Sequence, residues 1–256
     1  MKSFNFLLPK RENKPRKTGL TMALDKGLGY ETAKSLMEIA GEYVDFLKFG
    51  WGTIIIHDRE IIKKKIEMYK SFNIKPYTGG TLFEIAYKNN KITEFFKEAK
   101  SMGFDCIEIS DGSIDIEHEE KLEFIAKAKE KGFYVLSEVG KKDIDKDAAI
   151  DIDTRIDMVK RELEAGSNNV IIEARESGMS IGVFNEKGIA KEEEVDYLAK
   201  NLPMENIIWE APNKNQQVYF VLKFGKDVNL GNISSDDITS LETIRRGLRG
   251  DTLGKI

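Results

Sequence analysis

Short runs of apolar and β-branched residues alternate along the chain with longer segments in which apolar residues recur at helical spacing. The runs begin near Leu20, Phe46, Lys75, Cys106, Tyr134, Asn169, Ile207 and Val228. Neighbouring runs are separated by roughly the 30 residues that one βα unit occupies. Strands that alternate strictly with helices pair in parallel, so the pattern predicts an α/β protein with eight such units, a (β/α)8 TIM barrel.

The segments between the runs predict helices at 31–40, 59–71, 93–102, 119–131, 154–165 and 192–201, with shorter ones at 216–224 and 240–248. Gly103, Gly132 and Gly166 follow three of them, where a left-handed cap is expected. An open doubly wound sheet is disfavoured because the segment 25–29 lacks the third glycine of a dinucleotide-binding turn. No linker divides the chain, so we expect a single barrel domain over residues 1–256, with a basic N-terminal segment at 1–17.

Composition narrows the class of protein. The 256 residues include 40 Lys and Arg against 44 Asp and Glu, and the resulting net charge of −4 argues against nonspecific nucleic-acid binding. No apolar stretch approaches the roughly 18 residues of a membrane span or forms a signal-peptide core, so we expect a cytoplasmic protein with no membrane partner. Cys106 is the single cysteine, which excludes an intrachain disulfide and predicts a small core residue.

Charged residues stand at positions where a barrel interior is normally apolar. Between Val170 and Arg175 the even-numbered positions are all apolar, which predicts that Glu173 and Arg175 face the barrel interior near the end of the sixth strand. The same alternation turns four more charged residues inward on other strands: Lys48, Glu108, Glu138 and Glu210. Any one charge could belong to a structural ion pair, but such a concentration at one end of a barrel indicates an active site.

The residue types at this end limit its chemistry. Glu138, Glu173 and Glu210 offer hard oxygen ligands, whereas thiol and imidazole groups are scarce, so a Mg²⁺ site is favoured over a zinc site. Neither His57 nor His118 falls at a predicted strand end, and we expect surface or capping roles for both. Acid–base chemistry would then fall to a lysine or to a carboxylate.

Cations gather at the same end despite the overall acidity: Lys26, Lys48, Lys141, Lys142 and Arg175. Their density predicts a strongly anionic substrate, such as a phosphorylated carboxylic acid. Among the glycine-containing segments, Asn229, Gly231 and Asn232 form the preferred phosphate site, because barrels often bind phosphate on the loops after strands seven and eight.

Several motifs together resemble the phosphosulfolactate synthase family. In the first half they are Asp-Lys-Gly at 25–27, Lys-Phe-Gly-Trp-Gly-Thr at 48–53, Gly-Gly-Thr-Leu-Phe-Glu at 79–84 and Glu-Ile-Ser-Asp-Gly-Ser at 108–113. In the second half they are Glu-Val-Gly-Lys-Lys at 138–142, Ile-Ile-Glu-Ala-Arg-Glu-Ser-Gly at 171–178, Glu-Ala-Pro at 210–212, Gln-Gln-Val at 216–218, Asn-Leu-Gly-Asn-Ile at 229–233 and Leu-Arg-Gly-Asp-Thr at 248–252. The resemblance runs from about Thr18 to Gly254, and the basic stretch 10–17 departs from it.

The resemblance implies a barrel enzyme that adds sulfite to phosphoenolpyruvate with Mg²⁺ and gives (2R)-phosphosulfolactate, a carbon–sulfur lyase acting in the synthetic direction. The product leads to coenzyme M in methanogens or to sulfolactate in some bacteria. The resemblance also implies a homo-oligomer and suggests a trimer.

These implications fit the residues already singled out. Mg²⁺ on Glu138, Glu173 and Glu210 would stabilise the enediolate formed when sulfite attacks, and Lys141 or Lys142 would protonate carbon two. Lys26, Lys48 and Arg175 would hold phosphate and sulfite. Crowded cations would lower the pKa of the donor lysine toward neutrality.

Two other functions are compatible with the pattern. One is a Schiff-base aldolase or another enzyme acting on a phosphorylated carboxylic acid, in which an interior lysine attacks a carbonyl. The other is a noncatalytic barrel that binds an anion. The interior carboxylates argue against the second, because an anion binder gains nothing from acidic groups beside its ligand unless a metal intervenes.

Overall fold

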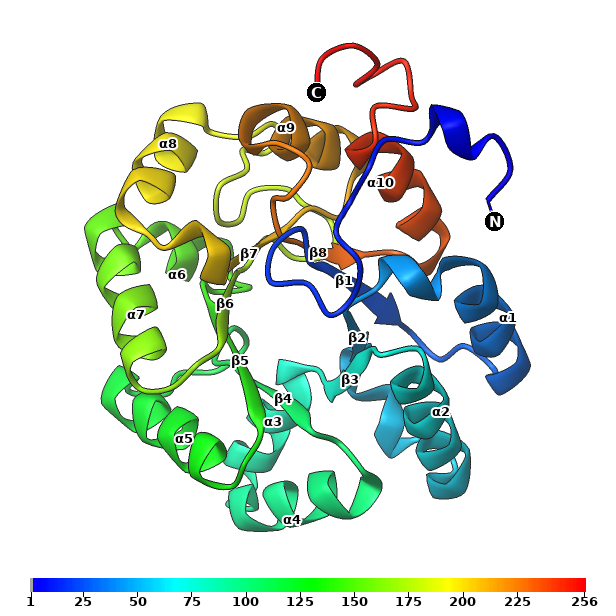
Figure 1. Cartoon of the computed structure of the whole chain (residues 1–256). Helices are drawn as coiled ribbons and strands as arrows, with labels where there is room; N and C mark the ends of the chain where they lie inside the picture. The colour runs from blue at the N-terminus through cyan, green and yellow to red at the C-terminus, as the bar shows by residue number, and fades with distance from the viewer. Residues whose placement is uncertain (1) are drawn as a thin grey trace.

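The computed structural model describes residues 2–256, which form a closed barrel of eight parallel strands surrounded by helices (Figure 1). The strands are β1 (Thr21–Asp25), β2 (Phe46–Phe49), β3 (Lys75–Thr78), β4 (Cys106–Ile109), β5 (Tyr134–Val139), β6 (Asn169–Ile172), β7 (Ile207–Glu210) and β8 (Leu230–Ile233). Each strand pairs with the next along the chain, and β8 closes the barrel against β1. The predicted TIM barrel is confirmed, and every predicted run begins within two residues of a strand start.

The helices are α1 (Tyr30–Ala40), α2 (Arg59–Ser71), α3 (Gly80–Lys88), α4 (Ile92–Met102), α5 (His118–Glu130), α6 (Ile144–Ala148), α7 (Ile152–Glu164), α8 (Glu192–Asn201), α9 (Lys214–Phe224) and α10 (Ile238–Arg245). Eight of them match predicted segments to within three residues at each end. The three glycines expected as caps have the left-handed φ values of 94°, 74° and 116° that such caps require. Within residues 2–256, none of the helices combines the length and the apolar character needed to cross a bilayer.

The pattern did not predict α3 and α6. The α6 helix has five residues, too few to display a helical period. The α3 helix begins at Gly80, in a glycine pair that favours a loop. A Cβ at Gly80 would lie 2.4 Å from Oε1 of Glu108, so glycine serves a close approach between a helix and a strand here.

Residues 2–256 also contain five short 3-10 helices. The first, η1 (Asn5–Leu7), lies in the N-terminal segment, and the others lie in connections: η2 (Gly41–Tyr43), η3 (Gly50–Ile55), η4 (Met204–Asn206) and η5 (Ser235–Asp237).

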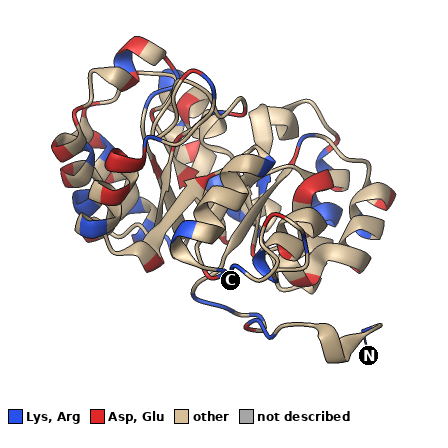
Figure 2. Ribbon diagram, turned by 90° about the horizontal axis from the view of Figure 1, so that it is seen from above, with Lys and Arg blue, Asp and Glu red and all other residues tan. Residues whose placement is uncertain are grey.

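The basic N-terminal segment lies across the end of the barrel where the strands begin (Figures 1 and 2). Nη2 of Arg11 donates to the carbonyl of Gly19, just before β1, at 2.6 Å. Nε of Arg16 lies 3.1 Å from Oδ1 of Asp45, just before β2. The segment therefore covers the end opposite to the one where the strands finish, and its cations are engaged in holding it there.

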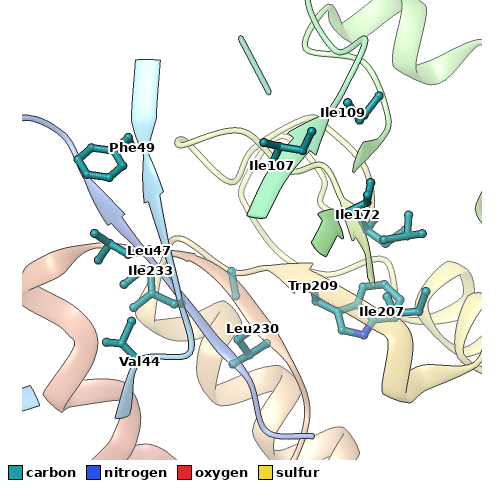
Figure 3. Packing of buried hydrophobic residues seen from close by; sticks show 14 of the residues in the cluster. Val44, Leu47, Phe49, Ile107, Ile109, Ile172, Ile207, Trp209, Leu230 and Ile233 are labelled. Carbon is teal, nitrogen blue, oxygen red and sulfur yellow. The ribbon is translucent and has the colours of Figure 1, made fainter. Parts of the chain in front are cut away.

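The apolar core has two parts, separated by the wall of the barrel. Outward-facing strand residues, among them Leu47, Ile107 and Trp209, pack in the cluster between the strands and the helices (Figure 3). A smaller cluster fills the interior: Leu20, Met22, Leu24, Phe46, Tyr77, Cys106, Leu136, Ile171 and Ile208. The alternation of side chains along each strand assigns its residues to one cluster or the other.

Candidate active site

The charged residues of the barrel interior form a layer at the carboxyl ends of the strands. Each follows an interior apolar residue by two positions: Lys48 after Phe46, Glu108 after Cys106, Glu138 after Leu136, Glu173 after Ile171 and Glu210 after Ile208. Side chains two apart in a strand share a face, so the alternation that fills the interior with apolar groups also turns these charges inward. The inward orientation predicted for these five residues agrees with the structure.

Three carboxylates meet in this layer. Glu138, Glu173 and Glu210 are each at most 3% exposed, and one oxygen from each lies within 4.8 Å of the others. Oε1 of Glu173 accepts from the backbone N–H of Arg175 at 2.6 Å, and Oε2 of Glu210 accepts from that of Ala174 at 3.0 Å. Among residues 2–256, no hydrogen-bond donor reaches either oxygen of Glu138 or Oε2 of Glu173.

The crowding of these carboxylates separates their pKa values. Burial and the charge of Glu138 raise the pKa of Glu173 well above its usual value. Burial also raises the pKa of Glu210 to about 7. For Glu138 burial acts in the same direction, but attraction from Lys142 and Lys48 outweighs it and lowers the pKa to about 2. Like charges this close cannot all stay ionised at neutral pH unless a cation joins them.

The three carboxylates fit a divalent cation. Buried carboxylate oxygens normally have hydrogen-bond partners, and the oxygens of Glu138 and Glu173 that lack one converge on the same small space. A set made only of carboxylate oxygens suits a hard ion such as Mg²⁺ better than zinc or copper. A possible acidic metal site is thus present where the sequence predicts it.

Lys48 is held beside this site by a second interior carboxylate. Its Nζ lies 3.1 Å from Oε2 of Glu108 and 3.7 Å from Oε2 of Glu138. Oε1 of Glu108 accepts from the backbone N–H of Gly80 at 2.7 Å, which fixes the carboxylate in turn. Burial opposes the charge on Lys48, but attraction from Glu108 prevails and raises the pKa of the lysine.

Lys142 lies at the site and Lys141 does not. Nζ of Lys142 is 3.8 Å from both Oε1 of Glu138 and Oε2 of Glu173. Nζ of Lys141 instead pairs with the carboxylate of Asp111 and donates to that residue's carbonyl at 2.9 Å. Lys141 therefore braces the loop after β4, and of the two lysines only Lys142 faces the carboxylates.

The expectation of a lowered lysine pKa is wrong for Lys142. Burial disfavours its charged form, but attraction from Glu138 and Glu173 outweighs both burial and repulsion from Lys48, so the pKa of Lys142 is raised. Its nearest charged neighbours are carboxylates rather than cations, which the sequence spacing did not indicate.

A cavity of about 210 Å³ opens above the carboxylates. Its lining includes the three glutamates together with Lys26, Lys48, Trp51, Lys142, Arg175, Glu176 and Asn232. Lys26 pairs with Glu176 across the mouth, and its Nζ lies 4.5 Å from the ring centroid of Trp51. The cavity therefore combines an acidic floor with a largely basic wall.

Arg175 reaches the cavity differently from the prediction. Strand β6 ends at Ile172, and Arg175 has a left-handed φ of 59° on the loop that follows. Strand alternation no longer applies there, so Arg175 is an exposed rim residue and does not face the barrel interior.

The phosphate loop expected at 229–232 is wrong in position. Asn229 precedes β8 at the opposite end of the barrel, where its side chain donates to the carbonyls of Glu205 and Ile207 and accepts from the N–H of Leu20. Gly231 lies within β8, and a Cβ there would be 2.6 Å from a side-chain atom of Met22.

Only Asn232 of that group lines the cavity. It has a φ of 58°, and its Nδ2 donates to the carbonyl of Arg175 at 3.0 Å, which ties the end of β8 to the rim. The glycine and asparagines of this segment favour a loop, yet Leu230–Ile233 form a strand.

The two histidines, the single cysteine and Asp25 do not line the cavity. His57 is exposed and His118 lies 3.5 Å from Glu162 beside α7. Cys106 is buried inside the barrel as expected. Asp25 faces the helix layer, where it accepts from the hydroxyl of Tyr69 at 2.7 Å.

The sequence did not single out Gly112 as a neighbour of the carboxylates. A Cβ at this position would lie 3.1 Å from Oε1 of Glu138 and 3.4 Å from Oε2 of Glu173. Its carbonyl accepts from the backbone N–H of Lys142 at 2.8 Å. The glycine in the segment 110–113 could have indicated this close approach, but an ordinary tight turn explains it equally well.

The chain is similar in sequence to phosphosulfolactate synthases. A sequence model of the (2R)-phospho-3-sulfolactate synthase (ComA) family matches residues 9–251. Identity is 57% to the phosphosulfolactate synthase of Methanothermobacter thermautotrophicus, over 100% of this chain and 99% of that protein. Identity is 52% to the phosphosulfolactate synthase of Methanocaldococcus jannaschii, over 100% of both chains.

Solved structures resemble the chain in fold. The 3-hexulose-6-phosphate synthase of Salmonella typhimurium superposes with a TM-score of 0.53 at 16% identity, over 92% of this chain and 94% of that chain. Identity this low supports the barrel architecture alone. The family match and the two relatives above 50% identity establish the family as well as the fold. The chain belongs to the (2R)-phospho-3-sulfolactate synthase family.

Proposed function

We propose that this enzyme joins sulfite to phosphoenolpyruvate in a Mg²⁺-dependent reaction and releases (2R)-phosphosulfolactate. The observation that carries the proposal is the buried group of Glu138, Glu173 and Glu210 at the floor of a cavity walled by cations, in which oxygens of Glu138 and Glu173 lack hydrogen-bond partners. A cation on the floor and lysines on the wall suit a small substrate that carries both phosphate and carboxylate charge.

The cavity separates two regions for these charges. Lys26, Arg175 and Asn232 line its outer part, and we assign the phosphate to them. Lys48 and Lys142 lie deeper, beside the carboxylates, and we assign the substrate carboxylate and sulfite to them. The volume of about 210 Å³ suits a three-carbon acid and is small beside the roughly 300–1,000 Å³ of drug-sized pockets.

Glu138, Glu173 and Glu210 would hold the Mg²⁺ ion. When bound there, the ion supplies electrostatic stabilisation for negative charge that develops on the substrate carboxylate. The rest of the chemistry is assigned to side chains of this chain.

The addition forms a bond between the sulfur of sulfite and the terminal methylene carbon of phosphoenolpyruvate. The electron pair of the carbon–carbon double bond moves toward carbon two and its carboxylate, and carbon two then takes up a proton. We assign the donor to Nζ of Lys142, because this lysine lines the cavity and its Nζ lies 3.8 Å from carboxylate oxygens of Glu138 and Glu173. A Schiff-base aldolase would need an unprotonated lysine, which the surroundings of Lys48 and Lys142 oppose.

The assembly and cellular setting are further parts of the proposal. The family resemblance suggests a homo-oligomer, specifically a trimer, and exposed apolar side chains such as Ile55, Ile56 and Ile85 offer surface for contact between copies. Light scattering would measure the number of chains. We also propose a cytoplasmic location and a product that enters the synthesis of coenzyme M or of sulfolactate.

Incubation of the purified protein with phosphoenolpyruvate, sulfite and Mg²⁺ tests the reaction. We expect phosphosulfolactate, identified by mass spectrometry, to accumulate as the enol absorbance falls. Omission of sulfite or addition of excess chelator should abolish the product, because one removes the nucleophile and the other the cation. Folded protein that forms no product would refute the reaction, and unchanged turnover in chelator would refute the metal requirement.

Substitution of Glu173 tests the metal site. We expect Glu173→Gln to weaken Mg²⁺ binding at least about tenfold, because it removes one negative charge from the site. Titration calorimetry measures the affinity without substrate. The exposed Glu186 provides the matched control, and Glu186→Gln should bind Mg²⁺ as wild type does. Equal affinity in Glu173→Gln would show that this residue is not a ligand.

Comparison of the neighbouring lysines tests the proton donor. We expect Lys142→Ala to lower kcat by about 100- to 10,000-fold, the range that general acids contribute. Lys141→Ala should lower kcat far less and should reduce the free energy of unfolding, since Lys141 braces the loop at Asp111. Steady-state kinetics and urea unfolding measure the two effects. A turnover near wild type in Lys142→Ala would contradict the assignment.

A further inference from the structure

Asp147 is a buried carboxylate that the proposed chemistry does not use. It lies on α6, in the connection after β5, and is 4% exposed. Its Oδ1 accepts from the backbone N–H of Lys141 at 2.9 Å and from Nη2 of Arg155 at 3.1 Å. Its Oδ2 accepts from the backbone N–H of Gly182 at 2.8 Å, on the loop after β6. One carboxylate therefore joins two of the loops that surround the cavity.

The two loops that Asp147 joins both pack against Glu173. A Cβ at Gly182 would lie 2.2 Å from the carbonyl oxygen of Glu173, so this glycine fits directly against it. Gly140, just before Lys141, also approaches Glu173 closely, because a Cβ there would lie 2.8 Å from Cβ of Glu173. Residues 140 and 182 thus enclose the backbone and the first side-chain carbon of Glu173 from two directions.

We infer that Asp147 is a positioning residue that fixes Lys142 and Glu173 relative to each other. One hydrogen bond to Asp147 comes from the backbone N–H of Lys141, the residue directly before Lys142. The other comes from the backbone N–H of Gly182, on the loop that packs on Glu173. This inference rests on the proposed function, in which these two residues hold the proton and the metal. The separation of 3.8 Å between Nζ of Lys142 and Oε2 of Glu173 is the distance that Asp147 maintains.

The contacts require a carboxylate at this position. Both oxygens of Asp147 receive hydrogens, two from backbone amides and one from Arg155. An asparagine offers one accepting oxygen and one NH₂ group, so at least one N–H of Lys141 or Gly182 would face a donor. A buried donor left without an acceptor is costly, and the two loops would separate at that contact.

Arg155 balances the charge of Asp147. Arg155 lies on α7 and is 6% exposed, so the charge of Asp147 is buried as part of an ion pair. Asp145, two residues before Asp147 on α6, is exposed. The two aspartates of one helix therefore offer a matched comparison.

Asp147→Asn and Asp145→Asn test the inference. In Asp147→Asn we expect kcat to fall by about 10- to 100-fold, the loss produced by small displacements of reacting groups, while the KM for phosphoenolpyruvate changes less than about threefold. Hydrogen exchange at the amides of Lys141 and Gly182 should become faster, and calorimetry should show weaker Mg²⁺ binding. Asp145→Asn should match wild type in all three measurements.

Several results would overturn the inference. They are wild-type exchange at both amides in Asp147→Asn, faster exchange with unchanged kcat and Mg²⁺ affinity, or equal losses in Asp145→Asn. If wild-type protein forms no phosphosulfolactate, the proposed function fails. The amide exchange rates and the Mg²⁺ affinity of Asp147→Asn then still decide whether Asp147 positions Glu173.

A measurement on wild-type protein covers the case in which Asp147→Asn does not fold. The amides of Lys141 and Gly182 should be protected from exchange, although both lie in connections outside the strands and helices. Asp147→Ser, whose hydroxyl can accept only part of these bonds, should expose both amides together. Free exchange of either amide in folded wild-type protein would refute the inference.

Discussion

Repulsion among three buried carboxylates is the constraint on which the rest of this site depends. One oxygen from each of Glu138, Glu173 and Glu210 lies within 4.8 Å of the others, and burial in the barrel interior leaves their charges poorly screened. Attraction from Lys142 and Lys48 outweighs burial at Glu138 and lowers its pKa, whereas burial and the charge of Glu138 keep the pKa values of Glu173 and Glu210 raised. Such an arrangement is costly for a fold and becomes favourable when a divalent cation occupies it, as expected at a functional site.

The barrel makes this concentration of charge possible. Parallel strands end at one edge, and their alternation places an apolar layer below and a charged layer above. Gly80 lets the start of α3 approach Glu108, and Gly112 lets the loop after β4 approach Glu138 and Glu173. On the other end, the N-terminal segment is tied down by Arg11 and Arg16, which leaves the carboxyl end as the open mouth.

Much of this could be predicted from the sequence, because periodicity is a local property. Strand positions, most helices and the inward orientation of Lys48, Glu138 and Glu210 follow from the alternation of apolar residues. Alternation stops being informative where a strand ends. Arg175 lies beyond β6 on a left-handed turn, and Asn229 lies before β8 rather than after it.

Partners brought together by tertiary structure were also beyond the reach of the sequence. Lys141 and Lys142 are adjacent and chemically identical, yet Asp111 binds the first and Glu138 and Glu173 surround the second. Nothing in the pattern marks Asp147 either, since its contacts come from two different loops. The local sequence thus indicates which charged side chains face the barrel interior, whereas the packing of the loops determines which partners each of them contacts.

The location of a bound divalent ion tests the central claim most directly. Crystals of the protein soaked in Mn²⁺, which shares the oxygen-ligand preference of Mg²⁺, would give an anomalous-scattering map of the ion. The account predicts one strong peak in each chain, bound by carboxylate oxygens of Glu138, Glu173 and Glu210. A peak at another place, or none at these oxygens, would contradict it.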